Sequence, residues 1–236
     1  MALILNIETS GEICSVALSK DGMIVYEQED TQGMNHAVKL APFVEKCMEE
    51  ISRHDEKLDA VAVSMGPGSY TGLRIGLSLA KGLAFAKDIP LIGVSTLKIL
   101  AVKGMFYSME WNGDEIFIPM IDARRMEVYA GAYDFALNPL MKEQPVILTE
   151  DSFKDTVKKG PVIFLGNGSE KFKDICEIKE SVWLGALLPH ARDMMPLSEK
   201  YFREGKFLDL AYSVPEYLKD YQTTTPKNKV INNDQI

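Results

Sequence analysis

Residues 59–76 read DAVAVSMGPGSYTGLRIG, and this stretch decides the fold class. Its first six residues are mostly apolar and predict a buried β-strand. The glycine-rich residues 66–72 predict a loop, and the residues after them predict a helix of about fifteen residues. A strand that runs through such a loop into a helix is typical of an α/β protein with parallel strands.

The residues around this stretch predict further strands and one more helix. Strand character is found in residues 2–8, 13–19, 23–29 and 90–94. Asp21-Gly22 predicts a hairpin turn, because both positions tolerate positive φ. Residues 36–52 predict an amphipathic helix with a kink at Pro42. The order βββ-α-β-α-β is that of the ribonuclease-H-like fold, which actin-like ATPases carry in duplicate.

A second, weaker unit follows and predicts a degenerate copy of the first. Strands are expected at 116–121, 127–135 and 161–165, and helices at 151–158 and 189–204. We therefore expect an α/β, actin-like protein of two lobes. Residues 1–100 would form the N-terminal lobe with the docking helices, 101–221 a smaller lobe with C-terminal helices, and 222–236 a disordered tail.

Composition narrows the function. The chain has 236 residues, a formal net charge of −8 and a pI near 5.0. A protein that binds nucleic acid alone usually carries a basic surface, so a partner is expected to supply the positive charge for any work on RNA. Three cysteines without a CxxC motif indicate a reducing compartment. We expect a cytoplasmic protein with no signal peptide and no membrane span.

The loop at 66–72 leaves two interpretations open. It precedes a helix N-terminus, where free N–H groups can bind an anion. Yet it matches neither GxxxxGK[ST] nor GxGxxG, and Pro67 removes one donor. The alternative is that the glycines form a tight turn and let two backbones approach each other.

The helix after the loop carries small residues at every fourth position. Gly72, Gly76, Ala80 and Ala84 form this stripe. Glycine inside a helix costs about 1 kcal/mol relative to alanine, so Gly76 and Gly82 indicate a compensating gain. Small residues at this spacing allow a second helix to come close. That helix could belong to this chain or to another subunit.

Catalytic and metal-binding motifs are not recognised. His36, His54 and His190 form neither HxxxH nor HExxH, and there is no GxSxG elbow. No catalytic residue and no metal site are therefore predicted. Thr9 and Ser10, at the end of the first strand, match in place the first phosphate loop of actin-like ATPases and are candidate nucleotide contacts. Those proteins usually have an aspartate at the strand end, where this chain has Glu8.

Several segments together resemble the TsaB (YeaZ) family. They are ILNIETS (4–10), GPGSYTGLRIG (66–76), KGLA (81–84), VSTL (94–97) and IDARRMEVY (121–129), with PEYLK (215–219) near the end. The resemblance covers the chain to about residue 221, and 66–76 is its most specific part. It implies the two-lobed, actin-like fold. It also implies a part in placing threonylcarbamoyl on N6 of adenosine 37 in tRNAs that read codons beginning with A.

The resemblance further implies a non-catalytic dimerisation subunit. A larger, homologous, TsaD-type subunit carries out the transfer, a small TsaE-type ATPase joins the complex, and tRNA is contacted only indirectly. Alone, the chain would form a homodimer through the same first-lobe helices, and ATP or ADP could sit at the subunit interface. The predicted partner interface comprises His36, Leu40, Val44, Leu73, Gly76, Leu77, Ala80, Lys81 and Ala84. Two alternatives remain, a nucleotide-binding ATPase and a glycoprotease-like peptidase.

Overall fold

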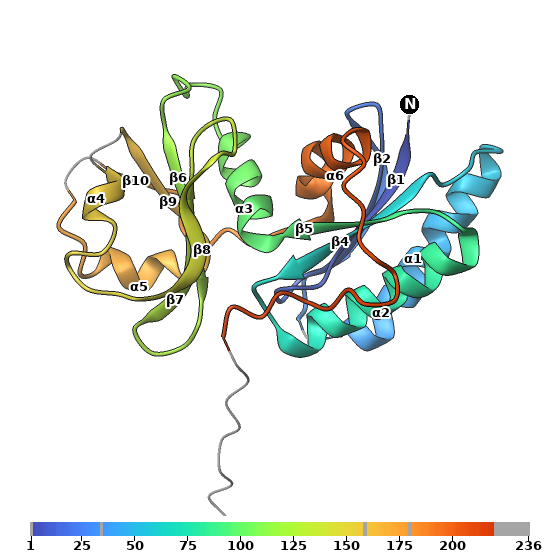
Figure 1. Cartoon of the computed structure of the whole chain (residues 1–236), viewed down its shortest axis with the longest axis horizontal. Coiled ribbons are helices and arrows are strands. Elements are labelled where there is room, and N and C mark those ends of the chain that lie inside the picture. The colour runs from blue at the N-terminus through green and yellow to red at the C-terminus, as the bar shows by residue number, and fades with distance from the viewer. Residues whose placement is uncertain (1, 34, 158–159, 179–180, 220–236) are drawn as a thin grey trace, which may run out of the picture.

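The computed structural model consists of two α/β lobes that lie side by side (Figure 1). It describes residues 2–33, 35–157, 160–178 and 181–219. Each lobe is built on a five-stranded mixed sheet. No helix among these residues combines the length and the apolar character needed to cross a membrane.

The first sheet has the strand order β3-β2-β1-β4-β5. Its elements are β1 (Leu3–Glu8), β2 (Cys14–Lys20), β3 (Met23–Asp30), α1 (His36–Arg53), β4 (Ala60–Gly66), α2 (Tyr70–Lys87) and β5 (Leu91–Ser95). β1 pairs antiparallel with β2 and parallel with β4, and β4 pairs parallel with β5. Every element expected before residue 95 is confirmed, including the helix that contains Pro42.

The turn between β2 and β3 has the predicted conformation. Asp21 has a φ of 55° and Gly22 a φ of 78°. Two consecutive positive φ values define the turn that matches the right-handed twist of a hairpin. The β2–β3 hairpin is therefore stabilised locally by its own turn.

The second sheet repeats the first. Its order is β10-β9-β6-β7-β8, with β6 antiparallel to β7 and parallel to β9. The elements are β6 (Ile116–Asp122), β7 (Glu127–Tyr133), β8 (Pro139–Ile147), α4 (Lys154–Val157), β9 (Val162–Leu165), α5 (Ser169–Lys173) and β10 (Ser181–Trp183). The order βββ-α-β-α-β thus occurs twice, and the predicted degenerate copy is confirmed.

Helices cover both faces of the first sheet, and one of them also packs against the second sheet. α1 and α2 cover one face of the first sheet through buried side chains such as Leu40, Cys47 and Leu77. The other face is covered by α3 (Thr96–Met105), the short helix η1 (Ala191–Met194) and α6 (Met195–Arg203). α3 also packs Leu97 and Leu100 against the second sheet. A single helix therefore joins the two lobes.

The C-terminal part of the chain returns to the first lobe. The Arg192 guanidinium bonds Glu29 of β3, and η1 and α6 pack on the first sheet. Beyond α6, Leu208 N–H donates to the Leu91 carbonyl at the sheet edge, and Glu216 N–H donates to the Met65 carbonyl. The expected division at residue 100 falls inside α3, and the expected C-terminal helices belong to the first lobe rather than the second. The tail 222–236 lies outside the described residues.

Candidate functional site

The turn after β1 is pressed directly against α2. Thr9 is fully buried, and its Oγ1 donates a hydrogen bond to the Gly72 carbonyl at 2.8 Å. Ser69 N–H donates to the Ser10 carbonyl at 2.7 Å. Ser69 also caps the helix, because its Oγ accepts the Gly72 N–H. These bonds satisfy polar groups of the turn and of the helix start, whereas the buried Ser10 Oγ has no partner among the described residues.

Three glycines make this contact possible. A Cβ at Gly68, Gly72 or Gly76 would come closer than 3.0 Å to an atom of Thr9 or Ser10. Real Cβ atoms do not approach other atoms so closely, so only glycine is tolerated at these positions. The structure thus supports the turn-and-approach interpretation of the loop at 66–72.

The small-residue stripe faces the interior of the chain, and this corrects the expected docking surface. Gly76 meets Thr9, and Ala80 and Ala84 lie in the core between α2 and the first sheet. The remaining apolar members of the predicted interface are buried as well: Leu40, Val44, Leu73 and Leu77. These side chains are used within the chain because they fill the space over the sheet.

Lys81 is also used within the chain. Its Nζ donates to the Ala211 and Ser213 carbonyls at 3.2 and 3.0 Å. We call residues 206–219 the C-terminal segment. About two helical turns away, Arg74 Nε donates to the Tyr217 hydroxyl at 3.0 Å. One side of α2 therefore holds the C-terminal segment in place.

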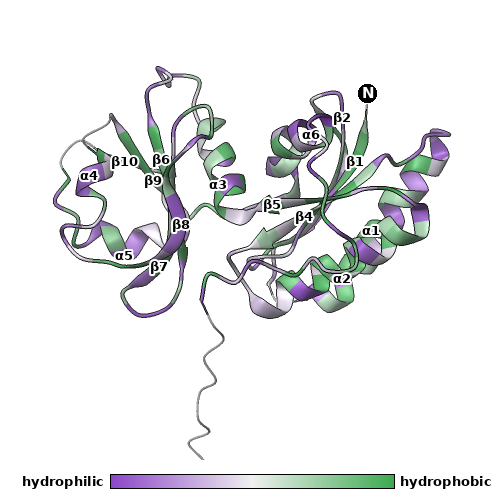
Figure 2. Ribbon diagram, viewed as in Figure 1, coloured by the Kyte–Doolittle hydropathy of each residue, from purple (hydrophilic) through white to green (hydrophobic). Residues whose placement is uncertain are grey.

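We define the outer face of α2 by Ile75, Leu79, Gly82 and Ala86, of which Gly82 and Ala86 are exposed and Ile75 and Leu79 are half-buried against the core. These residues follow at i, i+4, i+7 and i+11 and form a strip along the helix. A Cβ at Gly82 would meet no atom within 4 Å. Among the described residues Gly82 therefore has no packing partner, in contrast to Gly72 and Gly76. Figure 2 shows hydrophobic residues along α1 and α2.

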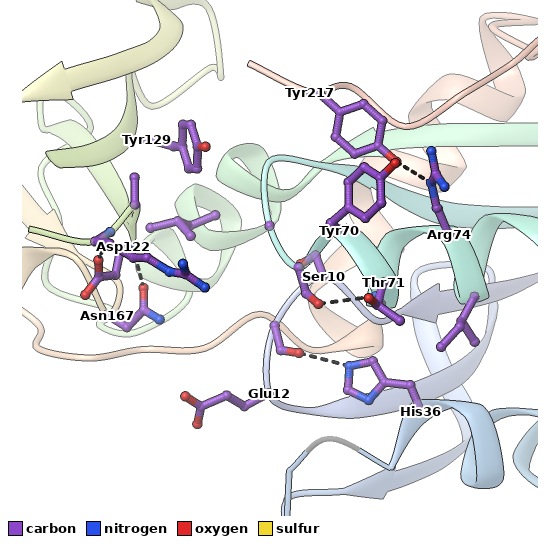
Figure 3. A pocket seen from close by; sticks show the side chains of 18 of the residues that line it. Ser10, Glu12, His36, Tyr70, Thr71, Arg74, Asp122, Tyr129, Asn167 and Tyr217 are labelled. Atoms are coloured by element: carbon purple, nitrogen blue, oxygen red, sulfur yellow. Dashed lines mark hydrogen bonds between the residues drawn. The ribbon is translucent and has the colours of Figure 1, made fainter. Parts of the chain in front are cut away.

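A cleft of about 1080 Å³ separates the two lobes. The first lobe contributes the turn at Ser10, the start of α2 and His36 from the start of α1. His36 is buried, and its Nε2 lies 2.9 Å from the Gly11 carbonyl. Figure 3 shows Ser10, Tyr70 and His36 on one side of the cleft, with Tyr129 and Asp122 opposite. Of the two candidate nucleotide contacts, Ser10 lines this cleft and Thr9 does not.

The second lobe closes the cleft with the β6–β7 hairpin. Asp122 accepts a bond from Lys171 Nζ at 2.9 Å, and its own N–H donates to Asn167 Oδ1. Burial tends to raise the pKa of the Asp122 carboxyl, but bonds from Lys171 and the Arg124 N–H outweigh this effect and lower it. Asp122 is therefore an ionised, structurally engaged carboxylate.

Glu8, at the end of β1, does not reach the cleft. It is fully buried, and its Oε1 accepts the Ser10 N–H at 2.5 Å, while Oε2 has no partner among the described residues. Burial raises the pKa of this carboxyl to about 7, against the lowering effect of the bonds from Ser10 and Ser64. Its position and protonation are unsuited to holding a metal or a water in the cleft.

The histidines are dispersed. His54 lies 3.0 Å from Glu50 on α1, and His190 lies 2.8 Å from Glu29. Within the described part of the chain, no three His, Cys, Asp or Glu side chains are grouped so that they could hold a metal ion.

Known proteins are similar to this chain in sequence and in fold. A family model described as TsaD, tRNA N6-adenosine threonylcarbamoyltransferase, matches residues 27–229. Proteins named tRNA threonylcarbamoyladenosine biosynthesis protein TsaB are similar, at 33% identity in Bacillus subtilis (92% of this chain, 93% of the relative) and 32% in Escherichia coli (92% and 94%).

The chain belongs to the TsaB family. A solved structure of YeaZ from Pseudomonas aeruginosa superposes with a TM-score of 0.79 at 28% identity, over 92% of this chain and all of that one. These similarities confirm the family that the sequence segments indicated. The two-lobed fold that the family resemblance implied is also confirmed.

Two features of this TsaB-type site were not anticipated from sequence. The C-terminal segment lines the cleft with Tyr217 and Lys219, and the Lys219 Nζ bonds Glu127 of the second lobe at 2.6 Å. The β6–β7 turn places Arg124 in the same cleft. The motif at 121–129 and the PEYLK segment marked both regions, but their spacing does not reveal that they meet.

The two helix glycines predict opposite responses to alanine. Gly76→Ala should lower the free energy of unfolding by about 1–3 kcal/mol, because the new methyl group overlaps Thr9. Gly82→Ala should raise it by up to about 1 kcal/mol, because only helix propensity changes. Urea denaturation of both variants measures the difference. A similar change of the same sign in both would contradict the assignment of the two faces.

The buried Glu8 predicts a pH-dependent loss of stability. Its pKa is higher in the folded chain, about 7, than its ordinary value of 4.5, so the folded state binds the proton more tightly. Stability from this group is present below pH 4.5 and is lost as the pH rises to 7. Glu8→Gln keeps an acceptor for Ser10 and removes the proton. Relative to the parent chain, the variant should gain about 3 kcal/mol between pH 4.5 and pH 8.

The control is Glu49→Gln, at an exposed position of α1. Its stability relative to the parent should stay constant over the same pH range. Denaturant titrations at several pH values provide the comparison. A constant difference for Glu8→Gln as well would refute a buried, protonated Glu8.

Proposed function

We propose that this chain is a subunit of the machinery that makes threonylcarbamoyladenosine in tRNA, and that it acts by docking rather than by catalysis. Its TsaB relatives are named for this pathway, and they are similar along nearly the whole chain. The observation that carries the docking role is the exposed Gly82 on the outer face of α2. A helix-interior glycine lowers stability, and here no contact within the described residues offsets that cost.

The docking surface consists of the outer face of α2 and the neighbouring side of α1. Ala37 and Ala41 are exposed on α1, and Ala37 lines the same cleft as Ile75 of α2. Small side chains along two adjacent helices leave little side-chain bulk on this surface. A helix from a partner can then approach closely, and Ile75 and Leu79 supply apolar area to bury.

The partner that matches this surface is the homologous TsaD-type transferase subunit. The present chain matches the family model of that transferase over residues 27–229, so both proteins share this architecture. Two related lobes can pair through equivalent helices in a nearly symmetric way. A second copy of this chain would present the same helices, which accounts for a homodimer when the partner is missing.

The net charge of the chain bears on which member of the complex holds the tRNA. The net charge of −8 disfavours direct binding of tRNA by this chain. We infer that the transferase subunit holds the tRNA, and that a TsaE-type ATPase joins the assembly. The chain itself would act in the cytoplasm, where tRNA is modified.

The catalytic alternatives have less support. An ATPase would need the turn after β1, but Thr9 is buried and bonded to α2, and the buried Glu8 does not line the cleft. A peptidase would need a nucleophile with a base, or a metal, and the histidines of the described chain lie on separate elements. A non-catalytic role accounts for both observations.

The docking surface is tested by Gly82→Arg. Arginine is a good helix former, so the chain should fold, yet its side chain would occupy the outer face of α2. Titration calorimetry with the TsaD-type subunit from the same organism should show at least a tenfold loss of affinity, and light scattering should show fewer homodimers. The matched control is Ile147→Arg, at an exposed apolar position of the second lobe. A folded Gly82→Arg chain that binds as tightly as the parent would refute this surface.

A further inference from the structure

The C-terminal segment continues the surface of α2 on the side of Lys81. It runs alongside α2, and the two Lys81 bonds to the carbonyls of Ala211 and Ser213 hold it there (Figure 1). Phe85 follows Lys81 by one helical turn, so it lies on the same side of α2, and it is exposed. The exposed surface of α2 therefore passes directly into that of the segment.

Large apolar side chains are exposed where the segment meets α2. Tyr212 is 85% exposed, Phe85 79% and Val214 68%. We call these three residues the Tyr212 patch. Single exposed apolar residues are ordinary, but three such side chains present on the order of several hundred Å² of apolar surface, the size at which an exposed patch marks an interaction site.

The backbone around Tyr212 is held by hydrogen bonds although it forms neither helix nor strand. Asp209 Oδ1 accepts the N–H groups of Ala211 and Tyr212 at 2.7 and 2.9 Å, and the Asp209 carbonyl accepts the N–H of Ser213 at 3.1 Å. Lys81 bonds the carbonyls on both sides of Tyr212. An aromatic side chain on a fixed backbone loses little conformational entropy when a partner covers it.

The segment is also tied to the first lobe on either side of the Tyr212 patch. Leu208 packs on the core of this lobe, and its N–H donates to the Leu91 carbonyl at 2.8 Å. Further along, Glu216 N–H donates to the Met65 carbonyl at 2.7 Å. The exposure of the patch is therefore a property of the folded chain and does not come from a loose end.

The docking surface proposed above has few large exposed side chains of its own. Its exposed members on α1 and α2 are glycine and alanine, whereas Ile75 and Leu79 are half-buried. A stable interface buries about 800 Å² on each partner, and a few large residues, tyrosine prominent among them, provide most of the binding energy. Small residues let a helix come close but supply little of that area. The Tyr212 patch supplies it on the adjacent side of α2.

We propose that the Tyr212 patch is the second half of the docking surface, and that Tyr212 is the anchor covered by the homologous transferase subunit when its helices pack on α2. The proposal rests on the docking function proposed above and names the residues that provide its affinity. A helix packed on α2 has its axis about 8–10 Å away, so its side chains stand beside the C-terminal segment. Because the patch has no charged side chain, the partner meets it with an apolar surface.

Titration calorimetry of full-length variants with the TsaD-type subunit of the same organism tests the anchor. Tyr212→Ala should weaken binding about 30-fold, the loss expected for an aromatic anchor of an interface. Tyr212→Phe keeps the ring and should bind within about threefold of the parent. The matched control is Tyr107→Ala, at an exposed tyrosine between α3 and β6, and it should bind as the parent does. Urea denaturation checks that each variant is folded.

Lys81 is a positioning residue of this surface. Lys81→Met keeps most of the alkyl chain and removes both bonds to the segment, so binding should weaken about tenfold. In the Tyr212→Ala background the same change should have little further effect, because the segment no longer carries the anchor. Amide hydrogen exchange at 211–213 should be faster in Lys81→Met. An equal loss of affinity with and without Tyr212 would overturn the positioning role.

The outcomes separate this proposal from the docking function itself. If Gly82→Arg weakens binding and a folded Tyr212→Ala binds as tightly as the parent, docking on α2 stands and the anchor is overturned. If neither variant weakens binding, the docking function fails as well. A Tyr212→Ala chain that loses only its homodimer in light scattering would assign the patch to a second copy of this chain and overturn the proposal. Equal losses for Tyr107→Ala and Tyr212→Ala would also overturn it.

Discussion

The structure depends on one close contact, in which the backbone of the turn after β1 lies directly on α2. The contact is possible because Gly68, Gly72 and Gly76 have no side chain where Thr9 and Ser10 approach. It sets the height of α2 above the first sheet and seals the end of β1, so that Glu8 is buried behind it. The rotation of α2 about its own axis is fixed at the same time. That rotation determines which residues of α2 face the core, the cleft and the C-terminal segment, and which remain exposed.

The glycines of α2 show what a sequence can and cannot reveal about such a helix. The spacing of Gly72, Gly76, Ala80 and Ala84 correctly indicated a close neighbour, but two neighbours would leave the same pattern. The neighbour is Thr9 of the same chain, which is distant in sequence and carries no mark of the contact. Gly82 stands off this stripe and has no internal neighbour. Gly82, which lies outside the four-residue spacing, is exposed, and we therefore place it in the proposed docking surface.

Much of the fold was predictable because its elements are locally determined. β1 and β4 of the first lobe are buried, largely apolar runs, and the residues Asp21 and Gly22 favour the positive φ values of their turn. β8 was missed because it is an edge strand that contains Pro139, Pro145 and charged residues, and β10 because it has three residues. In the cleft, Ser10 was identified from its place after β1. Arg124 and Tyr217 were not, because only tertiary structure brings the β6–β7 turn and the C-terminal segment together.

The two copies of the fold have diverged most in the length of their helices. α1 and α2 have 18 residues each, whereas α4 has 4 and α5 has 5. The second lobe compensates with a compact aromatic cluster of Phe153, Phe164, Phe172 and Trp183. Helices of one turn offer little area to dock a partner, and the docking surface that we propose lies on the longer helices of the first lobe. The second lobe keeps the hairpin that faces the cleft. A duplicated fold can thus lose half of one copy without losing the space between the copies, because that space is lined by turns and not by the helices that were shortened.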